Sequence, residues 1–113
     1  MATLNQDIRI EGGADFDIYL NISSSGTREN LTGGVVLAQI KESASSRTSI
    51  VTFQTSYLNA SNGEAKLTLS AEETRLLPAS SVYDVLYKNS GGKVFKLLYG
   101  KVEANLAVTE QVL

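Results

Sequence analysis

The chain has 113 residues, a formal net charge of −2 and 42% apolar residues. This length fits one domain, residues 1–113, with enough apolar side chains for a single core. The lysines and arginines are scattered, and no apolar stretch approaches the roughly 20 residues of a membrane span. We therefore expect neither nucleic acid, which needs a basic face, nor a membrane as a partner.

Alternating apolar side chains begin near the N-terminus. A short strand is expected around Ile8 and Ile10, and Gly12-Gly13 follows it as a turn. From residue 16 to residue 22 every second residue is apolar and the others are mostly polar, which is typical of a half-buried strand. The polar stretch 23–30 contains Gly26 and is expected to be a loop.

The middle of the chain repeats this pattern of strands and turns. Strands are expected over residues 35–41, at Val51 and Phe53, and over residues 64–69, where Ala65, Leu67 and Leu69 alternate with polar residues. The serine-rich stretch 43–49 is expected to be a loop. Asn62-Gly63 is a strong signal for a tight turn because both residues tolerate positive φ.

One helical turn interrupts the strands at about residues 71–77. Ser70 and Glu73 have the spacing of a capping box, and Pro78 ends the segment. We expect the turn to carry the chain from one sheet to the other, with one of the leucines 76 and 77 closing the end of the core.

The last third of the chain predicts a hairpin. Tyr83, Val85 and Tyr87 share one face of a strand, and the turn 89–92 joins this strand to the next. Apolar residues of one parity then continue to the tail, 109–113: Leu98, Val102, Ala104, Leu106 and Val108. The whole pattern predicts an all-β domain, an antiparallel β-sandwich with one short helical turn, an N-terminal arm and a C-terminal tail.

The composition offers little for catalysis. There is no histidine and no cysteine, so the commonest general base, metal ligand and thiol nucleophile are missing. The paired glycines do not form a phosphate-binding loop followed by a helix and a lysine, and are better explained as turns. We therefore predict no enzyme activity, no catalytic residues and no cofactor.

An acidic group near the N-terminus offers a possible calcium site. Asp15 and Asp17 lie on the same side of the expected strand, and Glu11 precedes them. Two residues along a strand span about 7 Å, which is wide for one ion, and calcium prefers six to eight oxygen ligands. A solvated face or a protected edge strand is the simpler interpretation, and no metal site is predicted.

The tyrosines divide into two groups. Tyr83 and Tyr87 share their parity with Val85 and are expected in the core. Tyr19 lies on the polar side of its strand and is the better candidate for a contact with a partner, because a tyrosine combines an apolar ring with a hydrogen-bonding hydroxyl.

Several short pieces of the sequence follow one another in a recognisable order. They are Leu31-Thr32-Gly33-Gly34, residues 63–74, Leu77-Pro78-Ala79, Val82-Tyr83-Asp84-Val85 and Leu97-Leu98-Tyr99-Gly100-Lys101-Val102. Together they resemble the small immunoglobulin-like domain of tailed-phage virion proteins, of which the N-terminal domain of the baseplate upper protein is the type example. The resemblance covers about residues 8–109. It departs at Gly34, where the family often has an aromatic, and at residues 107–109, where it often has a proline.

The resemblance implies an immunoglobulin-like β-sandwich in a phage virion protein, made in the cytoplasm of the host bacterium. Such a protein would be an adaptor of the tail or baseplate that docks on neighbouring virion proteins in several symmetric copies. A capsid decoration protein of the phage head is the alternative. A carbohydrate-binding module is a third hypothesis, against which the absence of tryptophan counts.

The candidate partner-binding residues lie on the second strand, in the loop that follows it and in the tail. They are Tyr19, Ser24, Ser25, Thr27, Arg28, Glu110, Gln111, Val112 and Leu113. An edge strand or a loop of a rigid sandwich suits docking, and symmetric copies let weak contacts add up.

Overall fold

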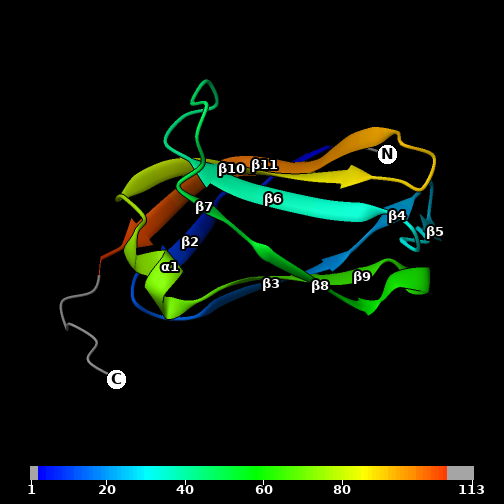
Figure 1. Ribbon diagram of the computed structural model, residues 1–113, viewed down its shortest axis with the longest axis horizontal. Helices are drawn as coiled ribbons and strands as arrows, with labels where there is room; N and C mark the ends of the chain where they lie inside the picture. The colour runs from blue at the N-terminus through cyan, green and yellow to red at the C-terminus, as the bar shows by residue number, and fades with distance from the viewer. Residues whose placement is uncertain (1–2, 107–113) are drawn as a thin grey trace.

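The computed structural model describes residues 3–106 and consists of two β-sheets stacked face to face (Figure 1). The larger sheet contains β1 (Leu4–Asn5), β2 (Ile8–Glu11), β6 (Val35–Lys41), β7 (Val51–Thr52), β10 (Ser80–Lys88) and β11 (Val94–Asn105). The smaller sheet contains β3 (Phe16–Asn21), β8 (Gln54–Asn59) and β9 (Glu64–Leu69). A separate hairpin is formed by β4 (Ser23–Ser24) and β5 (Thr27–Arg28). The expected all-β sandwich is confirmed.

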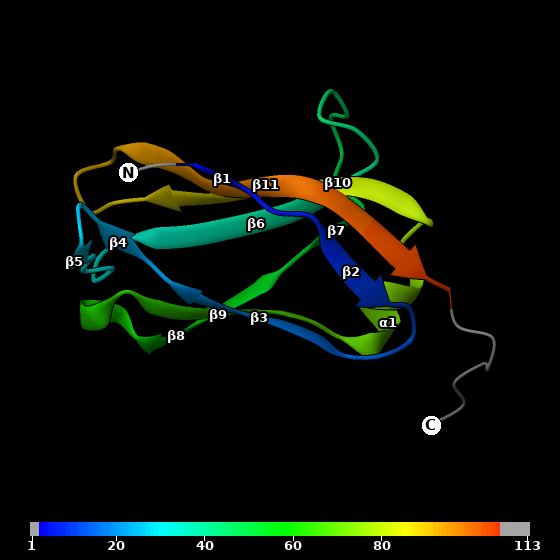
Figure 2. The ribbon, with the colours of Figure 1, turned by 180° about the vertical axis from the view of Figure 1, so that it is seen from behind.

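The two N-terminal strands join the larger sheet at β11. The larger sheet has the order β1-β11-β10-β6-β7, and β2 also pairs with β11. Both N-terminal strands run parallel to β11, beside which they lie in Figure 2. The sandwich is antiparallel, as expected, except for these two pairs. Parallel pairing requires a long connection, and here most of the domain separates the paired strands.

The core forms where the alternation is most regular. In β9, Ala65, Leu67 and Leu69 are fully buried, and in β10 the residues Tyr83, Val85 and Tyr87 face them from the other sheet. The placement of both tyrosines in the core is confirmed. Because side chains of a strand point alternately to its two faces, the residues between them, such as Lys66 and Asp84, lie on the outside.

The last strand does not keep a single parity. Val85 pairs with Leu98, but Leu86 pairs with Lys96, so Leu97 is an extra residue in β11. A bulge of this kind shifts the alternation of side chains along the strand. Leu97 is therefore buried, and so are Val102 and Ala104 after Gly100. The expected inward position of Leu106 is wrong, because its side chain is 62% exposed. Val108 lies outside the described residues.

The helical turn is confirmed at α1 (Ala71–Arg75), with a 3-10 turn η1 (Ala60–Asn62) elsewhere in the described chain. Ser70 Oγ accepts the Glu73 N–H at 3.2 Å, and the Glu73 carboxylate accepts the Ser70 N–H at 2.9 Å, which completes the capping box. The turn connects β9 to β10 of the other sheet, and Leu77 is the leucine buried at the end of the core. Neither described helix is long and apolar enough to cross a membrane.

Candidate docking site at the edge of the smaller sheet

The smaller sheet ends at β3, and no described strand pairs with the outer side of β3. Just after β3, the Ile22 N–H donates to the Gly63 carbonyl at 2.8 Å, in line with the β3–β9 register. Because backbone groups in an antiparallel pair alternate in direction, Asp17 and Tyr19 present their N–H and C=O groups to the open side. An edge of this kind is a template for one more strand.

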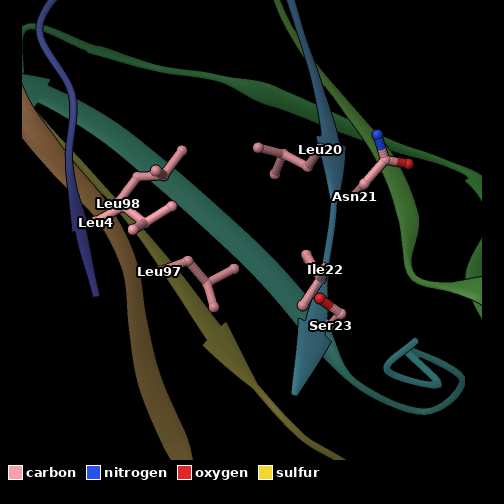
Figure 3. A pocket seen from close by; sticks show the side chains of 7 residues that line it. All are labelled: Leu4, Leu20, Asn21, Ile22, Ser23, Leu97 and Leu98. Atoms are coloured by element: carbon pink, nitrogen blue, oxygen red, sulfur yellow. The ribbon is translucent and has the colours of Figure 1, made fainter. Parts of the chain in front are cut away.

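An apolar slot of about 170 Å³ lies beside this edge (Figure 3). One wall consists of four consecutive residues from the end of β3 to the start of β4: Leu20, Asn21, Ile22 and Ser23. The other wall consists of Leu4 on β1 and the pair Leu97 and Leu98 on β11. A dry apolar cavity of about 150 Å³ is large enough for a benzene-sized group, so the slot has room for one apolar side chain.

The slot results from two local features of the larger sheet. The bulge in β11 brings both Leu97 and Leu98 to this side, and Leu4 pairs directly with Leu98. Since β1 contains only two residues and pairs with β11, it does not extend across to β3. Leu4 is left 60% exposed at the rim of the slot.

The chemistry of the slot suits binding. The residues that line it carry no ionisable side chain. An apolar slot next to unpaired backbone can hold an extended peptide.

The described groups with a shifted pKa lie elsewhere, in the core. Burial raises the pKa of Tyr83, and the nearby Asp7 charge adds to the effect. Burial also raises the pKa of Tyr87. The Tyr83 hydroxyl donates to the Gln6 carbonyl at 2.6 Å.

Tyr19 lies where the sequence predicts, on the outer face of the smaller sheet. Its side chain is 63% exposed, and the Lys66 ammonium lies 5.8 Å from the centre of its ring. The open backbone of β3 and this ring therefore belong to one edge, with the ring on the face turned away from the core.

The expected loop 23–30 is a hairpin instead. Ser24 and Thr27 pair across it, and Ser25 and Gly26 occupy the turn with φ of 52° and 79°. Two successive residues with positive φ match the twist of a two-residue hairpin, which is why this polar stretch forms strands. Arg28 donates to the Asn21 side chain at 3.0 Å, so the hairpin is fixed at the slot end of β3. The four remaining candidates, Glu110, Gln111, Val112 and Leu113, lie outside the described residues.

The three acidic residues considered for calcium each have another partner. Asp15 accepts the Ala71 N–H at 2.8 Å, and Asp17 accepts the Thr68 hydroxyl at 3.0 Å. Glu11 accepts the Asn105 side-chain amide at 3.0 Å. Within residues 3–106 no three metal-ligating side chains come together.

Sequence reasoning missed the leucines of the slot. Leu4 stands in a strand of two residues, too short to produce a periodic pattern. The neighbouring Leu97 and Leu98 break the alternation of β11, and this break was the available signal for a bulge. Comparison with models of known protein families and with curated proteins finds no match to this chain.

Proposed function

We propose that this chain is a non-enzymatic docking module of a phage virion, an adaptor of the tail or baseplate that accepts an extended segment of a neighbouring virion protein. The observation that carries the proposal is the open edge of β3 with the apolar slot beside it. The partner strand would pair with the backbone of Asp17 and Tyr19 and place one apolar side chain among the leucines of the slot. The assignment to a virion depends on the sequence resemblance described above.

In this proposal, pairing of the backbones and filling of the slot have different roles in recognition. Main-chain hydrogen bonds contribute affinity, and the slot selects a partner with an apolar residue at the matching position. A single short edge gives a weak contact, which several symmetric copies in one particle would strengthen.

The experiment compares Leu4→Asp with Leu76→Asp in purified phage particles. Both leucines are more than half exposed, at 60% and 64%, so neither substitution should disturb the core. Leu4 lines the slot, whereas Leu76 follows α1 and lies outside it. We expect L4D to lower the amount of this chain per particle at least tenfold and L76D to leave it unchanged.

A second pair of variants separates backbone pairing from side-chain contact. Tyr19→Pro removes the outward N–H, a change that edge strands tolerate, whereas Tyr19→Thr keeps it and removes only the ring. We expect Y19P to lose incorporation and Y19T to retain it. Absence of the chain from a mass-spectrometric inventory of the particles, or equal incorporation of L4D and L76D, would contradict the proposal. Labelling on the head instead of the tail would identify a capsid decoration protein.

A further inference from the structure

A second hollow lies on the outer face of the larger sheet. Its volume is about 580 Å³, and it extends over β6, β10 and β11 from Ala44 in the β6–β7 loop to Asp7 before β2. Sites for small ligands commonly measure about 300–1,000 Å³, so this groove has the size of a ligand site. It shares no residue with the slot beside β3.

Two lysines face each other across this groove. The register of the sheet places Lys41, Val82 and Lys101 in one row, with Val82 in the middle. Neighbouring strands are about 4.8 Å apart, so the two lysine backbones are separated by about 10 Å, within reach of one anionic group between the side chains. Among the described residues neither ammonium group takes part in an ion pair.

The other charges in the groove are already engaged. Lys96 lies 3.6 Å from the Asp84 carboxylate, and the Asp7 carboxylate accepts the Lys101 backbone N–H at 2.9 Å. Three ammonium groups therefore face two carboxylates in a chain whose net charge is −2. The surplus of positive charge is at Lys41 and Lys101.

The next row of the sheet adds an aromatic ring and polar groups. Gln39, Asp84 and Tyr99 lie in register, and Tyr99 is 43% exposed. The Lys96 ammonium lies 5.9 Å from the centre of the Tyr99 ring. The ring offers an apolar surface, and the amide and carboxylate groups beside it can hydrogen-bond to hydroxyls.

We propose that this groove binds a carboxylated sugar, such as a uronic acid residue of a polysaccharide. The sugar carboxylate lies between Lys41 and Lys101 over Val82, and the apolar side of the sugar ring packs near Tyr99. The sugar hydroxyls hydrogen-bond to Gln39 and Asp84. This inference goes beyond the docking function and does not depend on it, because the groove lies on the outer face of the larger sheet and shares no residue with the slot.

The test is a titration of the isotope-labelled full chain, followed by amide NMR shifts. The probes are galacturonate and glucuronate, with galactose and glucose as neutral counterparts that carry a hydroxymethyl group in place of the carboxylate. We expect both uronates to shift amides on β6, β10 and β11 and to bind at least tenfold more tightly than the neutral sugars. Equal binding of the neutral sugars, or no binding of either uronate at millimolar concentration, would overturn the proposal.

Variants then separate sugar recognition from plain anion binding. The double variant Lys41→Gln, Lys101→Gln should weaken uronate binding at least tenfold. Lys88→Gln should leave it unchanged, since Lys88 is an exposed lysine of β10 that does not line the groove. Tyr99→Ser should weaken binding of uronate but not of inorganic phosphate. If phosphate binds as tightly as uronate and Y99S has no effect, the groove is a simple anion site and the proposal fails. Tighter binding of an acetylated acidic peptide would assign the groove to a protein carboxylate instead.

Discussion

Thr74 shows how one buried hydroxyl holds two elements together. The residue is fully buried in α1, and its Oγ1 accepts the Gly13 N–H at 3.0 Å from the turn between β2 and β3. The same hydroxyl lies within donating distance of the carbonyls of Ala14 and Ala71, at 2.9 and 3.0 Å. Thr74 therefore fixes the short helix against the first turn of the chain.

Replacing Thr74 by valine tests this connection with almost no change of shape. Thr74→Val leaves the Gly13 N–H without its acceptor, and we expect a loss of about 1–3 kcal/mol in the free energy of unfolding. Thr74→Ser keeps the hydroxyl and should retain the hydrogen bonds, so it should lose less than the valine variant. Urea unfolding measures both. A valine variant as stable as the original chain would show that the hydroxyl contributes nothing.

The raised pKa of Tyr83 affects the free energy of unfolding at high pH. Burial and the Asp7 charge raise the pKa of Tyr83 in the folded state above its usual value of 10.0, so the folded protein holds this proton more tightly than the unfolded chain. The resulting stability is present below about pH 10 and is lost as the pH rises through the folded-state pKa. In Tyr83→Phe the alkaline fall in the free energy of unfolding should therefore be shallower.

The control for Tyr83→Phe is Tyr19→Phe, on the exposed face of the other sheet. We expect the Tyr19 variant to keep the slope of the original chain between pH 9 and pH 11, roughly the range around an ordinary tyrosine pKa. At neutral pH, Y83F should lose about 0.5–1.5 kcal/mol because the hydrogen bond to Gln6 is gone. Equal slopes for both variants would contradict a role for Tyr83.

At the scale of elements, the strands that could be predicted are those with one clearly buried face. The expected strand 35–41 matches β6, and the alternation at Tyr83 and Tyr87 matches β10, because the burial of one face is encoded within a few residues. The exposure of Tyr19 followed from the same pattern. The parallel pairing of β1 and β2 with β11 could not be predicted, since it joins residues about 94 positions apart. The slot is formed by the pairing of β1 with β11 and by the bulge in β11, so the sequence pattern did not predict the slot either.

Gly100 allows the segment between β1 and β2 to approach β11 closely. A Cβ at this position would collide with the carbonyl oxygen of Gln6 and would lie 2.7 Å from its carbonyl carbon. Backbone atoms cannot turn aside as a flexible side chain can, so Gly100→Ala must displace the segment between β1 and β2. We expect the free energy of unfolding to fall by about 1–3 kcal/mol, as for other overpacked sites.

Gly91→Ala is the matched control for Gly100→Ala. A Cβ at Gly91 would have the Asn89 side-chain oxygen as its nearest neighbour, at 3.4 Å, which is an ordinary contact. Urea unfolding should therefore show little change for G91A. If G100A is equally mild, the N-terminal strands do not pack on β11 as closely as described.

At the scale of the whole molecule, both sheets contribute to one core. Leu67 of the smaller sheet and Val85 of the larger sheet belong to the same buried cluster, and both are fully buried. The chain contains no cysteine and therefore no disulfide to hold the sheets together. The stacking of the two sheets consequently depends on the burial of these side chains, and a defect on either sheet should weaken both.

Leu67→Ala tests this dependence between the sheets. Removing most of a fully buried leucine from β9 should lower the free energy of unfolding by about 2–5 kcal/mol. Far-ultraviolet circular dichroism follows the strands of both sheets, while the amide NMR signals of β6 and β10 follow the larger sheet alone. Because one core serves both sheets, the two signals should change at the same, lower urea concentration. The control Leu58→Ala, at a leucine 54% exposed, should shift the midpoint far less. Separate midpoints for the two signals in L67A would mean that the larger sheet stays folded without the smaller one, and the single shared core would then be disproved.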